Sequence, residues 1–379
     1  MIFYLGAQMK GVKQRSRMTM KVQKGFDAMI ITKKLKTILF CLIMFAAIPG
    51  LEAQKVSKLD LNRQPATASM QMLHVADGGK AAELAVKVVK GAQDGPVFTV
   101  VAGIHGFEYP PIVALQELML EIRAENLKGT LVILPVANVN GFYGRTAFYN
   151  PQDGKNLNRV FPGKADGTIS ERLADLITRE VISQSKVFLD IHAGDANEDL
   201  LDFVCYYENK DMPVQTALAK HLAENSGFKF QVAYPFHLAE NQPAEYAFKQ
   251  ASRQGVTALS FEAGKLGNVQ RESVDRIKRG IYNLLAELAM YEKSGKSSNV
   301  ETVLLNAQKY IKSPAQGIFY SDLKSGDKVV TGQKLGSITD IFGQKIADIL
   351  ADQEGILLYK IGTPPVLEGE TLFCIGYSN

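Results

Sequence analysis

Cysteine is scarce in this sequence, which excludes a small fold held together by disulfides. The 379 residues contain three cysteines. Cys41 lies in an N-terminal segment that we expect to be removed, and Cys205 and Cys374 fall in different predicted domains. We therefore expect no disulfide in the mature chain.

Long apolar runs are missing as well. The most apolar stretch, Ile38 to Ile48, has eleven residues, whereas a membrane-spanning helix needs about 20. This excludes a polytopic membrane protein, and no stable membrane anchor is expected. Three lysines precede the run and a Pro-Gly pair follows it, which is the order of a secretory signal peptide. We expect residues 1–53 to be a leader with a signal peptide around 29–53, and the protein to be exported to the periplasm; an uncleaved signal anchor is the alternative.

The main part of the chain also lacks an excess of either charge. The sequence has 43 Lys and Arg against 39 Asp and Glu. Nine of these basic and two of these acidic residues lie in residues 1–53, which leaves the rest with a net charge of −3. Without a basic excess, nucleic acid is not expected as a partner. The content of 46% hydrophobic residues is typical of a globular protein with a sizeable core.

Short apolar runs alternate with amphipathic segments between about residues 95 and 295. Helical stripes occupy residues 169–181 and 274–288, and Thr168 and Glu171 have the spacing of a capping box before the first. The alternation predicts an α/β fold with a mostly parallel sheet flanked by helices. The strand-like runs are residues 97–102, 130–136, 187–191, 203–207 and 256–261.

Glycines interrupt short β-rich runs beyond Glu301, which predicts a small all-β domain. The polar stretch 292–299 is typical of a linker. We therefore predict an α/β domain over residues 54–298 and a β domain over residues 299–379.

Two of the five histidines lie where a catalytic site is expected. His105 and His192 each follow a predicted strand, at the edge where parallel α/β sheets bind their ligands. Glu108 comes three residues after His105 on the same loop. Two imidazoles and one carboxylate leave a fourth position for water, which is the arrangement of a catalytic zinc.

Two further clusters could complete such a site. The pair Asn158-Arg159, with Arg145 upstream, could hold a carboxylate, because guanidinium binds carboxylates bidentately. Glu262 ends the last strand-like run, and a carboxylate there could take a proton from water and return it to a leaving amine. Asp190 is either a structural residue or a hydrogen-bond acceptor for a ligand imidazole.

Four motifs resemble the succinylglutamate desuccinylase/aspartoacylase family, whose members are zinc hydrolases related to the zinc carboxypeptidases. Asn156 stands where many members have Asp, and Asn158 comes thirteen residues after Arg145, a longer spacing than in the aspartoacylases. In chain order the motifs are His105-Gly-Phe-Glu108, Asn156-Leu-Asn-Arg159-Val-Phe-Pro-Gly163, Asp190-Ile-His192 and Phe261-Glu262-Ala-Gly264.

The resemblance implies a zinc-carboxypeptidase-like fold and a role for each motif. One zinc per chain would be bound by His105, Glu108 and His192. Glu262 would be the general base and acid, and Arg145 a second donor to the oxyanion. The substrate would be held by Arg145, Asn158 and Arg159.

The C-terminal region resembles the barrel-sandwich hairpins of biotinyl and lipoyl carrier domains. Its lysines lack the neighbours of a carrier lysine, so we expect a wall or lid over the cleft and no swinging arm.

These observations predict an exported zinc-dependent hydrolase, a deacylase that cleaves an amide or ester bond of a small, anionic, N-acyl amino-acid-like substrate. Two alternatives are a periplasmic zinc carboxypeptidase or amidase that acts on cell-wall peptides, and a catalytically inactive zinc protein that binds an anion. The acyl group, the amine and the oligomeric state are left open.

Overall fold

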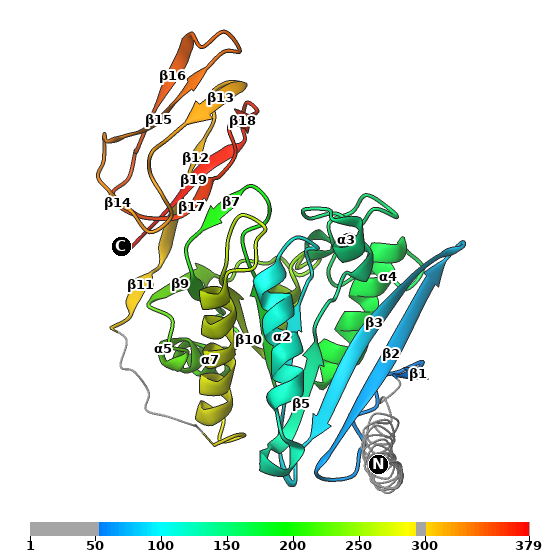
Figure 1. The fold of residues 1–379 in the computed structure, drawn as a ribbon. Helices are drawn as coiled ribbons and strands as arrows, with labels where there is room; N and C mark the ends of the chain where they lie inside the picture. Colours follow the sequence, from blue (N-terminus) through cyan, green and yellow to red (C-terminus); the bar gives the residue numbers. More distant parts are fainter. Residues whose placement is uncertain (1–52, 293–300, 379) are drawn as a thin grey trace, which may run out of the picture. The chain divides into compact units, whose positions relative to one another are not determined.

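The computed structural model describes residues 53–292 and 301–378 (Figure 1). Residues from Ala53 onward cluster into one compact unit. The predicted signal peptide, like most of the predicted linker, lies outside the described residues. Within the described ranges, no helix combines the length and the apolar character needed to span a bilayer.

A ten-stranded sheet forms the centre of the α/β part. The described strands pair in parallel except at β2–β3, β3–β5 and β10–β8, which confirms the mixed, mostly parallel sheet. In spatial order the strands are β1 (Gln54–Val56), β2 (Thr67–Asp77), β3 (Lys80–Lys90), β5 (Lys128–Leu134), β4 (Gln93–Ala102), β6 (Val187–His192), β10 (Thr257–Glu262), β8 (Phe203–Glu208), β9 (Phe230–Pro235) and β11 (Val303–Leu305).

Helices cover both faces of this sheet, because successive residues of its central strands are buried on opposite sides. One core joins the sheet to α2 (Tyr109–Glu121), α5 (Pro213–Asn225) and α7 (Arg271–Glu287). The second core joins the other face to α4 (Ile169–Leu176) and α6 (Ala247–Arg253). The short helix α3 (Val139–Gly144) follows β5.

The predicted capping box is present at the start of α4. The backbone N–H of Thr168 donates to Glu171 Oε2 over 2.9 Å, as such a box requires. The apolar stripe continues beyond the helix through a π-helical turn, Ile177–Val181.

The C-terminal region is all β and consists of two small sheets around a core of its own. The strand β11 lies beyond the predicted boundary at residue 299, yet pairs with β9 in the large sheet. The first small sheet contains β12 (Ala307–Lys312), β19 (Thr371–Tyr377), β17 (Gly355–Ile361), β14 (Lys328–Val329) and β7 (Glu198–Leu200). The second contains β16 (Lys345–Leu350), β15 (Lys334–Thr339), β13 (Gly317–Tyr320) and β18 (Pro365–Val366).

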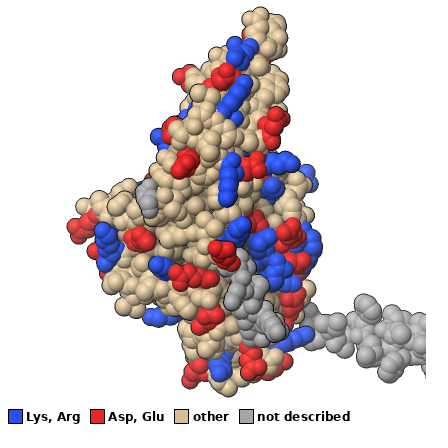
Figure 2. Space-filling view, turned by 90° about the vertical axis from the view of Figure 1, so that its left-hand side faces the viewer, with Lys and Arg blue, Asp and Glu red and all other residues tan. Residues whose placement is uncertain are grey.

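The strand β7 links the two parts of the fold. It follows β6 by only a few residues and pairs antiparallel with β17, so that Leu200 lies opposite Tyr359. The C-terminal sheet is thereby held next to the carboxyl end of β6. On the face shown in Figure 2, acidic and basic side chains are interspersed.

Candidate active site

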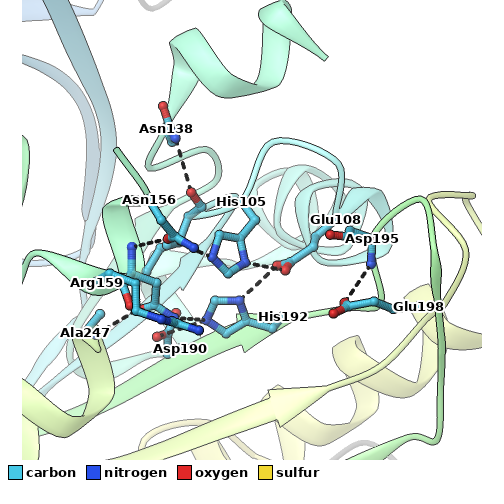
Figure 3. A network of polar contacts seen from close by, with 12 residues as sticks. His105, Glu108, Asn138, Asn156, Arg159, Asp190, His192, Asp195, Glu198 and Ala247 are labelled. Carbon is cyan, nitrogen blue, oxygen red and sulfur yellow. Dashed lines mark hydrogen bonds and ion pairs between the residues drawn. The ribbon is translucent and has the colours of Figure 1, made fainter. Parts of the chain in front are cut away.

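Three side chains converge at the carboxyl edge of the large sheet (Figure 3). His105 Nδ1 lies 2.6 Å from Glu108 Oε1, and His192 Nδ1 lies 2.9 Å from Glu108 Oε2. Ligand atoms of the three residues all lie within 4.8 Å of one another. Two imidazoles and a carboxylate are ligand types that zinc prefers, so the donor set fits the predicted metal.

Local chain geometry accounts for this convergence. His192 is the last residue of β6, and Glu108 is the residue that precedes α2. The loop from His105 to Glu108 passes very close to α3, because a Cβ atom at Gly106 would lie 2.3 Å from the backbone of Gly141. Only glycine permits this approach, which explains the glycine after the first histidine.

The outer nitrogens of both rings face oxygen acceptors. His105 Nε2 lies 3.2 Å from Asn156 Oδ1, and His192 Nε2 lies 3.2 Å from Asp190 Oδ2. Such contacts fix the ring orientation and the tautomer of metal-binding histidines. Asp190 is thus at ion-pair distance from His192 and makes no side-chain hydrogen bond within the described part of the chain, so its role as an acceptor stays a prediction. An amide oxygen of Asn156 takes the place of the carboxylate found in many family members.

The electrostatics of the cluster favour a positive charge between the three side chains. Burial acts to raise the pKa of Glu108, but the charges of His105 and His192 and their hydrogen bonds lower it to about 2. Burial acts to lower the pKa of His192, yet the carboxylates of Asp190 and Glu108 raise it well above its usual value. A cation bound between these side chains would therefore be stabilised by the ionised carboxylate of Glu108.

Glu262 lies beside the cluster, because it pairs in register with His192 on the neighbouring strand. Burial and the negative charges of Glu108, Glu198 and Asp190 raise its pKa to about 8, against the lowering effect of His192. A carboxyl group with a pKa near neutral can both accept and donate a proton.

The predicted substrate-binding pair lies in a short turn at the mouth of the site. Asn158 is buried, and its Oδ1 accepts a hydrogen bond from the backbone N–H of Ala247 over 2.9 Å, while its Nδ2 lies 3.5 Å from His192 Nε2. The exposed guanidinium of Arg159 lies 4.6 Å from the centre of the Tyr246 ring. Among the described residues, no carboxylate lies within ion-pair distance of Arg159, so it is free to bind an anion.

Arg145 lies apart from these groups. It is exposed, caps α3 with a positive φ of 52°, and is not among the residues that line the cavity described below. Its predicted contact with the substrate therefore depends on a conformation different from this one, and its role stays a prediction.

Two acidic residues beside the cluster were not predicted from the sequence. Asp195 and Glu198 follow β6, and the backbone N–H of Asp195 donates to Glu198 Oε2 over 3.1 Å. Burial and the charges of Asp195 and Glu108 raise the pKa of Glu198 to about 8. Their position in the sequence could have indicated them, because Asp195 comes only three residues after His192, at the end of the same strand.

The cluster opens into a cavity of about 910 Å³. Glu262, Asn158 and Arg159 line this cavity, as do Asp195 and Glu198. Residues of the C-terminal sheet form a further part of its lining, which agrees with the expected wall. They are Tyr310, Leu358, Tyr359, Thr371 and Cys374.

Comparisons with known proteins agree with this architecture. Residues 94–288 match the model of the succinylglutamate desuccinylase/aspartoacylase catalytic domain. The N-alpha-acetyl-L-2,4-diaminobutyric acid deacetylase of Halomonas elongata is 31% identical over 297 residues, which cover 76% of this chain and 84% of that protein.

Solved structures show the same fold. The succinylglutamate desuccinylase/aspartoacylase structure from Rhodobacter sphaeroides has a TM-score of 0.75 at 24% identity and covers 85% of this chain and 98% of its own. The product-bound ectoine utilization protein EutE (DoeB) from Ruegeria pomeroyi has a TM-score of 0.75 at 23% identity and covers 84% of this chain and 98% of its own. Since the catalytic-domain model spans more than half of the sequence and the Halomonas relative is aligned over most of its length, this chain belongs to the succinylglutamate desuccinylase/aspartoacylase family.

Proposed function

We propose that this chain is an exported, zinc-dependent hydrolase that removes the acyl group from an N-acyl amino acid. The family and the deacetylase relative support an amide-bond deacylase. The observation that carries the zinc is the convergence of His105, Glu108 and His192 within 4.8 Å. Export rests on the basic and apolar segments of the leader alone.

Zinc bound by these three residues would act as a Lewis acid on the scissile carbonyl and lower the pKa of a water molecule. The protein's own contribution begins with ring orientation, because Asn156 and Asp190 hold the outer nitrogens of the two histidines. Glu262 accepts the proton of the attacking water and then donates it to the leaving amine, for which a pKa near neutral is suited.

Substrate orientation is the second contribution of the chain. Arg159 binds the carboxylate of the amino acid at the mouth of the cavity, where Tyr246 supports the guanidinium from below. Asn158 Oδ1 accepts a hydrogen bond from the backbone N–H of Ala247 at the start of α6, which holds this turn in place beside His192. Arg145 is a second donor to the developing oxyanion if its segment moves toward the cavity on binding.

The test is to measure zinc content and hydrolysis together. The purified protein is expected to bind about one zinc per chain and to hydrolyse members of a panel of N-acyl amino acids. In His105→Ala both properties are lost, because one of three ligands is missing. His221→Ala is the matched control, since His221 lies on the surface and pairs with Glu287.

Two outcomes would contradict the proposal. A protein that takes up no metal after reconstitution with zinc has no such site. Zinc binding without turnover of N-acyl amino acids, but with cleavage of cell-wall peptides, would favour a carboxypeptidase or amidase instead.

A further inference from the structure

The cavity continues well beyond the residues needed for hydrolysis. We call its extension the aromatic arm. It is lined by Cys205, Tyr207, Tyr234, Phe248, Tyr310 and Cys374.

The direction of the aromatic arm follows from the strand register. Phe203 lies opposite Glu262, and Cys205 lies opposite Ser260 on the same face of the sheet. Tyr207 is two residues further along β8. A strand rises about 3.3 Å per residue, so the arm extends about 13 Å from the row that contains Glu262.

Aromatic rings form the walls of the arm. Tyr207 stacks on Phe248 with ring centres 4.5 Å apart and planes inclined by 21°, and Tyr234 lies 5.9 Å from Tyr207. The C-terminal sheet covers the arm with Tyr310 from β12 and Cys374 from β19. Rings held in this way form a preformed surface for a flat or apolar group.

No charged side chain lines the arm, although Lys249 Nζ lies 5.8 Å from the centre of the Tyr207 ring. Burial raises the pKa of the Tyr207 and Tyr234 hydroxyls and of the Cys205 thiol, so that all three stay neutral at physiological pH. The charged residues of the cavity lining are not part of the arm. They are Glu108, Asp195, Glu198, Arg159 and Glu262.

The position of Glu262 decides which half of the substrate enters the arm. In the proposed function Glu262 donates a proton to the leaving amine, so the group next to Glu262 belongs to the amine half. Arg159 binds the carboxylate of that half above Tyr246, which also lines the cavity. The part of the cavity past Tyr246 and along β8 is then open to the side chain of the amino acid.

We infer that the amino-acid half of the substrate carries a large neutral side chain, aromatic or long aliphatic, which occupies the aromatic arm. This inference rests on the proposed function, because it assumes that the amine leaves beside Glu262. A small, anionic or cationic side chain would leave the arm unfilled or place a charge among neutral rings, which is unfavourable.

The first experiment compares substrates of one acyl group. We expect kcat/KM for N-acetyl-L-phenylalanine and N-acetyl-L-leucine to exceed that for N-acetyl-L-alanine, N-acetyl-L-aspartate and N-acetyl-L-2,4-diaminobutyrate at least tenfold, because apolar contacts discriminate by about this factor. A preference for the aspartate or diaminobutyrate compound would overturn the inference and leave the deacylase standing.

Binding of the amine product separates this inference from the proposed function. Calorimetry with the zinc-reconstituted protein is expected to show at least tenfold tighter binding of L-phenylalanine than of L-aspartate or L-2,4-diaminobutyrate. If no substrate is hydrolysed but this preference in binding is found, the proposed function is wrong, whereas the aromatic arm still binds a large neutral side chain. If L-phenylalanine binds no more tightly than L-aspartate or L-2,4-diaminobutyrate, the inference about the aromatic arm is wrong.

Two substitutions alter the arm from the side of the C-terminal sheet. Cys374→Phe narrows it, and Tyr310→Ala removes one wall at a residue that is 52% exposed, so the variant is expected to fold. Each is expected to lower the ratio of kcat/KM for the phenylalanine compound to that for the alanine compound at least fivefold. Val330→Phe is the control. Val330 also belongs to the C-terminal region, is 60% exposed and does not line the cavity. A ratio that stays the same in both arm variants would overturn the inference.

Discussion

The buried surroundings of Glu262 raise the pKa of its carboxyl group to about 8, a value suited to proton transfer near neutral pH. The substitution Glu262→Gln is expected to lower kcat/KM by about 10²–10⁴-fold, because the amide of glutamine cannot transfer the proton that the carboxyl group transfers. The zinc content should stay at the wild-type level, since Glu262 is not among the three converging ligands. Metal analysis and steady-state kinetics check both statements. Glu287→Gln, which changes a carboxylate on the outer surface of α7, is the control.

The two arginines predicted to bind substrate differ in their surroundings. Arg159 lines the cavity and Arg145 does not, so Arg159→Ala is expected to raise KM about 10–100-fold, as the loss of a charged hydrogen bond does. Arg145→Ala is expected to have a smaller effect. Measuring KM and kcat separately for both variants tests this order, and a larger effect at Arg145 would indicate a closing movement of its segment.

At the scale of elements, the pairing of β7 with β17 holds the C-terminal sheet against the catalytic edge. Asp199 lies in this pairing, where its carboxylate contacts Lys265 Nζ at 2.8 Å and accepts hydrogen bonds from the backbone N–H and the hydroxyl of Ser325. Neighbouring Glu198 and Tyr359 line the cavity. A change at Asp199 should therefore affect both stability and activity.

Asp199→Ala is expected to lower the free energy of unfolding by about 1–2 kcal/mol, because it removes a buried carboxylate that accepts two hydrogen bonds from Ser325 and contacts the partly exposed Lys265. Denaturation in urea measures this loss, and kcat/KM should fall as well. Asp348→Ala removes an exposed carboxylate that contacts only Lys334 and Lys345 among the described residues, and should cost less than about 0.5 kcal/mol. Equal losses in the two variants would show that β7 does not hold the sheet in place.

For the whole molecule, the buried carboxyl groups of the site make the stability of the metal-free protein depend on pH. The pKa values of Glu198 and Glu262 are raised to about 8 in the folded chain, from an ordinary value near 4.3 in the unfolded chain. The stability that comes from holding their protons is present at acid pH and is lost as the pH rises through about 8. The raised pKa of His192 acts in the same direction, whereas the stability that comes from the lowered pKa of Glu108 is complete above about pH 4.5 and is lost as the pH falls toward about 2.

Chelator-treated protein is therefore expected to be less stable at pH 9 than at pH 6, by on the order of 2–4 kcal/mol, since one pKa unit corresponds to about 1.4 kcal/mol. Thermal unfolding at the two pH values measures the difference. Zinc should reduce it, because the bound cation replaces the protons of the cluster. A metal-free protein that gains stability toward pH 9 would contradict this account.

Strand ends were the most predictable part of the site. His192 and Glu262 end strands that their apolar runs predict, and the parallel pairing of these strands brings the two residues into register. Asp195 and Glu198 escaped detection because they follow a strand without a motif of their own. The aromatic arm could not be predicted, since Tyr207 and Tyr310 are distant in sequence and meet only through packing.

The sequence by itself determined the family, the α/β and β character of the two regions, and the side-chain types to which the proposed function assigns metal binding and proton transfer. These depend on local periodicity and on side-chain type, which are properties of the chain before it folds. The tertiary structure decided that Asn156 and Asp190 lie beside the outer nitrogens of the two histidines, that Arg145 lies outside the cavity, and that the C-terminal sheet forms a wall of the arm. Such features require residues far apart in sequence to approach within a few ångströms, and only the packing of the complete fold brings them there.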